Sequence, residues 1–215
     1  MVAAERLVTE LASARIGTTF NQYREGPRAP LLRERLTAYL VERSQAPVLL
    51  VGEAPGYRGA RVSGIPFTSE RQLTGSGPAE ATATIVHRVL GELGLEEDVL
   101  LWNVVPAHPG TETSNRPPTR DEIDAGLPFV RALAAGRRVV PVGRVAQRAL
   151  GAPGIRHPSH GGAGSFRRGL VLVIEAGGSP RAAGIWKDRH FTGAEYVDAI
   201  RRGDMNEGLR RLGIE

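Results

Sequence analysis

The chain has 215 residues, of which 41% are hydrophobic and 24% are charged, and this composition predicts one soluble globular domain over residues 1–215. Because the sequence has no cysteine and no apolar run of transmembrane length, we exclude disulfides, a cysteine-held iron–sulfur cluster and a membrane span. The formal net charge is +5, and all but one of the 28 basic residues are arginine, which suits contacts with phosphate and equally suits a GC-rich genome.

The first third of the chain alternates between helical and extended patterns. Residues 3–14 form a charged amphipathic helix rather than a signal peptide, so we expect a cytoplasmic protein. Residues 30–43 repeat the helical period, with a proline where the first turn tolerates it. Residues 47–51 are a continuous apolar run ended by glycine, which predicts a strand buried on both faces. Residues 53–77 are rich in glycine and lack a period, which predicts a long loop.

The same alternation continues to the C-terminus. The next predicted elements are a helix over 85–93, a strand over 99–104, a loop over 108–118 and a helix after the capping box of Thr119 and Glu122. A strand over 138–142, a short helix over 143–150 and a short strand before His157 follow. The last predicted elements are a strand over 170–174 and a helix after the capping box of Thr192 and Glu195. Pro128 is expected to bend or divide its helix. The alternation predicts a three-layer α/β/α fold with a central, mostly parallel sheet.

Candidate site residues follow two of the predicted strands, where ligands of open α/β sheets bind. The segment Gly52-Glu53-Ala54-Pro55-Gly56 allows close backbone approach and supplies one carboxylate, although a simple turn remains an alternative. It is neither a Walker loop nor a dinucleotide fingerprint. Asn103 ends the next strand, and its amide can donate one hydrogen bond and accept another, with a turn cap as the alternative.

A third candidate is the segment His157-Pro158-Ser159-His160, which follows a short predicted strand. No carboxylate lies at metal-ligand spacing from the two histidines, so we expect no metal site. The sequence also has no Gly-x-Ser-x-Gly elbow, which argues against an esterase of the α/β-hydrolase type.

In order and spacing, these segments resemble the motifs of the uracil-DNA glycosylase superfamily. Residues 52–56 resemble the first motif, and residues 64–69, which include Phe67, resemble the segment whose aromatic ring stacks on the flipped base. The strand that ends at Asn103 resembles the one carrying the base-reading asparagine, and residues 157–159 resemble the second motif. The resemblance implies excision of uracil from DNA by base flipping and hydrolysis of the N-glycosidic bond.

The resemblance, together with the arginines that lie near its motifs, predicts a set of site residues. These are His157 and Glu53 as catalytic residues; Gly52, Glu53, Ala54, Gly56, Phe67 and Asn103 as base-binding residues; and Ser159, His160, Arg58, Arg156, Phe166 and Arg167 as contacts to DNA. It implies DNA containing uracil as the substrate, and we expect a monomer. Relatives that share this Gly-Glu-Ala-Pro-Gly motif usually carry a four-cysteine iron–sulfur cluster, which a chain without cysteine cannot hold. We therefore expect a cluster-free branch of the superfamily and no cofactor.

Three positions depart from the pattern of the superfamily's most active branch. Ala54 replaces the aspartate that orients the attacking water, and Glu53 is a candidate for part of that role. Gly56 replaces the tyrosine that excludes the thymine methyl group, which leaves Tyr57 or the loop over 58–62 as candidates for that task. Glycine also stands at the position of the apolar wedge, which leaves His160 or Phe166 as the candidate wedge.

Two alternative functions remain at this point. One is excision of another deaminated base, such as hypoxanthine or xanthine, because the tyrosine is missing. The other is a non-catalytic nucleic-acid-binding protein, with Ala54 as the trace of a lost catalytic residue. Phe67, Asn103 and His157 together argue against the second alternative, because passive binding requires none of them.

Overall fold

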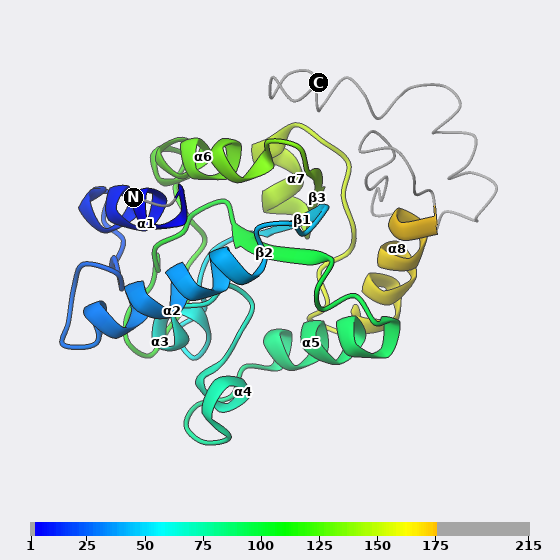
Figure 1. Ribbon diagram of the computed structural model, residues 1–215, viewed down its shortest axis with the longest axis horizontal. Helices are drawn as coiled ribbons and strands as arrows, with labels where there is room; N and C mark the ends of the chain where they lie inside the picture. Colours follow the sequence, from blue (N-terminus) through cyan, green and yellow to red (C-terminus); the bar gives the residue numbers. More distant parts are fainter. Residues whose placement is uncertain (1–2, 176–215) are drawn as a thin grey trace.

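A parallel sheet in the order β2-β1-β3 lies at the centre of the fold (Figure 1). The computed structural model describes residues 3–175, and in that part of the chain the strands are β1 (Val48–Gly52), β2 (Val99–Asn103) and β3 (Arg138–Pro141). All three are buried along their whole length, as their apolar sequences predict. The register pairs Gly52 with Asn103, so two of the predicted site segments begin side by side at one edge of the sheet.

Helices cover both faces of this sheet. They are α1 (Ala3–Ser13), α2 (Ala29–Glu42), α3 (Ala60–Ser63), α4 (Glu70–Thr74), α5 (Ala81–Leu93), α6 (Arg120–Ala134), α7 (Arg144–Leu150) and α8 (Ala163–Glu175). Side chains of β1 alternate between two cores: Leu49 and Val51 pack with α1, α2, α6 and α7, whereas Val48 and Leu50 pack with α5 and α8. The predicted three-layer α/β/α fold is therefore confirmed.

The capping box predicted at the start of α6 is present. The side chain of Thr119 accepts a hydrogen bond from the Glu122 amide at 3.3 Å, and the Glu122 carboxylate accepts one from the Thr119 amide at 2.9 Å. Glu122 also binds the Arg116 guanidinium, which is the main reason that its pKa falls to about 2. Pro128 lies inside α6 without dividing it.

Two predicted elements are wrong. Residues 170–174 are part of helix α8 rather than a strand, because Phe166, Leu170 and Val173 recur at helical spacing and face the core. Residues 53–77 are not a loop throughout, since they contain α3 and α4, which are too short to create a visible period. The short strand before His157 is reduced to a single parallel bridge between Val142 and Ile155.

Part of the sequence prediction falls beyond the region that the structure covers. The capping box of Thr192 and Glu195 lies outside the described residues. Within residues 3–175, no helix has both the length and the apolar character needed to cross a bilayer.

Candidate functional site

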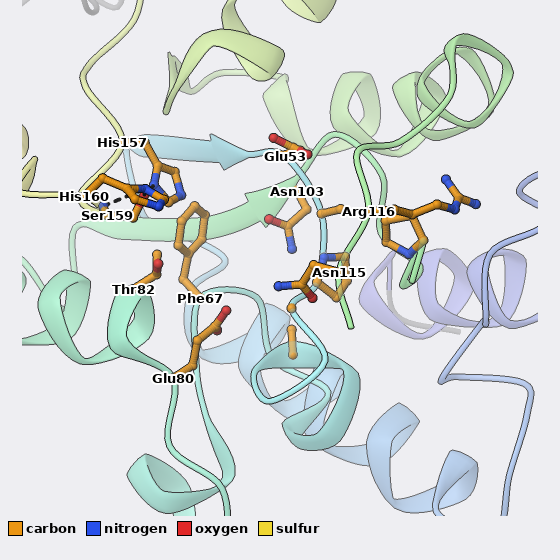
Figure 2. A pocket seen from close by; sticks show the side chains of 15 residues that line it. Glu53, Phe67, Glu80, Thr82, Asn103, Asn115, Arg116, His157, Ser159 and His160 are labelled. Atoms are coloured by element: carbon orange, nitrogen blue, oxygen red, sulfur yellow. Dashed lines mark hydrogen bonds between the residues drawn. The ribbon is translucent and has the colours of Figure 1, made fainter. Parts of the chain in front are cut away.

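A cavity of about 270 Å³ opens at the carboxyl ends of β1 and β2 (Figure 2). This volume is close to the lower end of the range for small-molecule sites, about 300 Å³. The predicted residues that line it are Glu53, Ala54, Gly56, Phe67, Asn103, His157, Ser159 and His160. The fold thus brings segments that are about a hundred residues apart in the sequence to one cavity.

Gly52 allows the aromatic ring and the amide of the site to meet at the strand end. A Cβ at this position would lie 2.8 Å from Cε2 of Phe67 and 3.0 Å from Oδ1 of Asn103, so no larger residue fits without moving them. Phe67 itself has a φ of 53°, a left-handed conformation that bulky residues rarely adopt. Such strain persists where the surroundings hold it, often at functional sites. Here Ser63 supports the segment by donating a hydrogen bond to the Thr68 carbonyl at 2.6 Å.

Asn103 presents an unused amide to the cavity. The alternation along β2 places it on the same face as Leu101, which is also the face against which Phe67 packs. The residue is only 4% exposed, and no side chain or main chain within residues 3–175 forms a hydrogen bond with its amide. Its polar atoms face the cavity, where a ligand can reach them. A ligand with one donor and one acceptor on an edge would satisfy this group.

His157 is held as a neutral ring that can donate a hydrogen bond from Nε2. The Ser159 amide donates to Nδ1 at 3.2 Å, and the Ser159 hydroxyl lies 2.7 Å from the same nitrogen. A nitrogen that accepts a hydrogen bond carries no proton, so the proton is on Nε2. Burial lowers the pKa of His157, and the nearby His160 and Arg156 lower it further. These effects favour the neutral imidazole.

Among the residues that the structure describes, two carboxyl groups line the cavity, those of Glu53 and Glu80, and only Glu53 was predicted. Burial raises the pKa of Glu53, while the charge of Arg148 opposes this rise. Burial alone raises the pKa of Glu80. Sequence reasoning missed Glu80, because its place at the start of a helix after Gly77-Pro78 says nothing about the direction of its side chain.

The loop over 108–118 braces the first motif and was not predicted to do so. His108 is fully buried, and its Nδ1 lies 2.7 Å from the Pro55 carbonyl oxygen. Asn115, which also lines the cavity, accepts a hydrogen bond from the Tyr57 amide at 2.9 Å. His108 is one of only five histidines in the sequence, and this rarity was the available signal. The sequence did not show its partner.

The predicted DNA contacts fall into two groups. Arg156 lines a second cavity of about 190 Å³, together with His157, Ser159 and His160, so it lies beside the site. Arg58 is exposed next to the first motif, and Arg167 is exposed on α8, where it forms an ion pair with Glu92 at 3.5 Å.

Phe166 is the exception among these predicted contacts. Its side chain is 0% exposed and packs in the core with Leu170 and Val173. The structure therefore contradicts the expectation that Phe166 contacts DNA, because the ring would have to leave the core. The helical spacing of Phe166, Leu170 and Val173, which the strand prediction overlooked, is the sequence signal that would have placed the ring of Phe166 in the core.

Tyr57 or the loop over 58–62 was expected to exclude a methyl group from the base, but most of these residues do not line the cavity. Neither Tyr57 nor Arg58 lines it, and within residues 58–62 only Ala60 does. The wall on that side is completed by Glu80, whose carboxyl lies near Phe67 (Figure 2).

Comparisons with known proteins identify the family and the fold. A model of the uracil DNA glycosylase superfamily matches residues 40–195. The chain is 31% identical over 107 residues to the type-4 uracil-DNA glycosylase of Pyrobaculum aerophilum, and the match covers 48% of this chain and 47% of that protein. The chain thus spans about half the length of this curated relative. In fold it is similar to the crystal structure of wild-type SMUG2 from Pedobacter heparinus, with a TM-score of 0.51 and 13% identity over 70% of this chain and 80% of that chain.

Proposed function

The chain belongs to the uracil DNA glycosylase superfamily, and from this premise we propose that it excises uracil from DNA. The observation that carries the proposal is the unpartnered amide of Asn103 beside the Phe67 ring in the cavity. A base extruded from the helix would stack on the ring and satisfy the amide with its Watson–Crick edge. Uracil offers a donor at N3 and an acceptor at O4, which complement Oδ1 and Nδ2 of the asparagine.

The proposed reaction breaks the bond between C1′ of the sugar and N1 of uracil. The electron pair of that bond stays with the base, which leaves as an anion, while positive charge builds on the sugar. His157 stabilises the anion by donating from Nε2 to O2, as a preorganised oxyanion donor does. Water then adds to C1′ and gives up a proton, and the uracil anion takes up a proton, so the products are an abasic site and free uracil.

Glu53 is the residue that we assign to the attacking water. Its neighbour Ala54 lies in the same turn and has no polar side-chain atom, so it cannot orient a water molecule. Glu53 lines the cavity, as Asn103 does. Burial raises the pKa of Glu53 and the charge of Arg148 opposes this rise, and its carboxylate can accept a hydrogen bond from water. In this assignment the carboxylate also faces the positive charge that develops on the sugar.

The direct test uses an end-labelled oligonucleotide with one uracil, treated with the protein and then with alkali. We expect strand scission at the uracil, and hypoxanthine and xanthine substrates in parallel reactions measure the base preference. Release of free uracil identifies the glycosylase product. Tight binding of the oligonucleotide without scission would instead support the non-catalytic alternative, and scission only at hypoxanthine or xanthine would contradict the assignment of uracil.

Binding to duplex DNA should weaken as salt rises. Each phosphate contact contributes about −0.9 to the slope of log affinity against log salt concentration. We expect Arg58→Ala, at an exposed position beside the first motif, to reduce that slope by about one contact. Arg6→Ala on α1 is the matched control and should leave the slope unchanged. A flat salt dependence of the parent protein between about 50 and 200 mM, where such contacts are normally visible, would contradict phosphate contacts.

With Phe166 in the core, His160 remains the candidate wedge that fills the gap left by the flipped base. It is exposed and has a φ of 51°, directly before Gly161 with a φ of 75°, so the tight turn projects it beside the cavity. We expect His160→Gly, which tolerates this backbone, to slow excision most for uracil paired with adenine, less opposite guanine and least in single strands. Single-turnover rates on the three substrates measure this order. Equal losses on all three would indicate general binding instead.

A further inference from the structure

The side chain of Glu80 lines the cavity, although a residue at the start of a helix need not do so. It is the residue that precedes helix α5, with extended backbone angles, yet its side chain forms no capping hydrogen bond with that helix. The carboxyl group points instead toward the first motif and lines the cavity (Figure 2). Among the residues that the structure describes, none forms a hydrogen bond or an ion pair with this carboxyl group.

The carboxyl group of Glu80 fills the space that a side chain at position 56 would take. A Cβ on Gly56 would overlap Oε1 of Glu80 and lie 3.0 Å from its carboxyl carbon, and a Cβ on Gly59 would lie 2.8 Å from that carbon. The backbone of Gly56 is outside the left-handed region, so its conformation does not demand glycine. The absence of a side chain at this position leaves the space that the Glu80 carboxyl group occupies.

The carboxyl group of Glu80 lies on the side of the cavity toward which C5 of the proposed substrate, uracil, would point. In Figure 2, His157 and Glu80 lie on opposite sides of the Phe67 ring, and Asn103 lies between them on a third side. In a uracil ring, C5 is directly across from C2. A base whose O2 faces His157 and whose N3–O4 edge faces Asn103 therefore turns C5 toward Glu80.

Resting on the proposed function, we propose that Glu80 determines specificity by excluding bases with a methyl group at C5, chiefly thymine. Uracil and thymine differ only in that methyl group, so a site distinguishes them by what it places next to C5. A methyl group there would have to displace the carboxyl group or strip it of water, which is unfavourable for a polar group that has no other partner. Burial raises the pKa of Glu80, but the group takes up the same volume in either protonation state.

The test compares uracil and thymine, each opposite guanine, by single-turnover excision. We expect Glu80→Ala to lower the ratio of the uracil rate to the thymine rate by about 10–200-fold, the range over which a pocket discriminates one methylene group. Glu80→Gln keeps the volume and is the matched control, so its ratio should stay near that of the parent. Adding Gly56→Ala to Glu80→Ala returns a methyl group to the emptied space and should restore part of the ratio.

A binding measurement separates failure of this inference from failure of the proposed function. The probes are duplexes with a 2′-fluoroarabino uracil nucleotide, which resists cleavage, and with its 5-methyl counterpart. Loss of the parent's preference for the uracil probe in Glu80→Ala but not in Glu80→Gln would support the inference even if no base were excised. Circular dichroism of each variant confirms that it is folded.

Three outcomes would overturn the inference. An unchanged ratio in Glu80→Ala, while the parent excises uracil, would reject it and leave the proposed function intact. Loss of uracil excision in Glu80→Gln as well as in Glu80→Ala would place the carboxyl group in the chemistry instead. A parent protein that neither excises uracil nor prefers the uracil probe would contradict both proposals.

Discussion

Replacing His157 by alanine is expected to slow uracil excision at least about a hundredfold, the usual effect of removing one oxyanion donor. The ring is the donor that we assign to O2, and it is already held in the tautomer that this role requires. Single-turnover rates with enzyme in excess measure the chemical step rather than product release. Ser159→Ala is the matched control, because it removes the hydroxyl partner of the ring but keeps the amide that donates to Nδ1. A rate of His157→Ala within about threefold of the parent, far from that hundredfold loss, would remove the assignment.

The same residue predicts a pH dependence. The pKa of His157 lies below 6.5, its ordinary value, mainly because the ring is buried. Because the shift is downward, the neutral ring predominates at neutral pH, and we expect no fall in the excision rate from its titration there. The assignment of a neutral donor would be contradicted if the rate of the parent depended on a single ionisation above pH 6.5 and the rate of His157→Gln did not.

Replacing Asn103 by aspartate is expected to abolish most uracil excision and to permit some excision of cytosine. A carboxylate offers only acceptors, so it repels O4 of uracil but accepts a hydrogen bond from the amino group of cytosine. Sites built to hydrogen-bond one group reject an analogue that lacks it by about 10⁴-fold or more. Oligonucleotides with a single uracil or a single cytosine measure both rates. Asn103→Ala is the control, since it removes the uracil contacts without adding a partner for cytosine.

The outcome for Asn103→Asp can also exclude the proposed role. If the aspartate variant keeps the uracil rate of the parent, Asn103 does not contact the Watson–Crick edge. If both variants lose uracil excision and neither acts on cytosine, the residue contacts the base without selecting it.

The sequence predicted the sheet and most of the cavity because both depend on short-range patterns. Apolar runs that end in glycine or asparagine mark the carboxyl ends of β1 and β2, and parallel pairing then brings Gly52 beside Asn103. The turn after the bridge at Ile155 places His157 at the same edge. For these residues, position along the chain fixes position in the site.

The features that the sequence did not predict depend on the direction of single side chains. The five apolar residues over 170–174 fit a buried strand as well as a helix, and only the wider spacing from Phe166 separates the two. Glu80 was missed because the same residue at a helix start can cap the helix, face solvent or line a cavity. Gly56, which is 24 residues earlier in the chain, leaves open the space that the Glu80 carboxyl group occupies, and the two come together only after folding.

The pairing of β1 with β2 also ties base recognition to correct folding. Side chains along a strand alternate between faces, so a slip of one residue would turn Asn103 away from Phe67 and into the apolar layer that Leu100 and Trp102 occupy in the native register. Such a chain would bury the amide in an apolar layer, out of reach of any ligand, and would lack the group that we propose to recognise uracil. Under the proposed function, molecules misfolded in this way would lose base excision altogether.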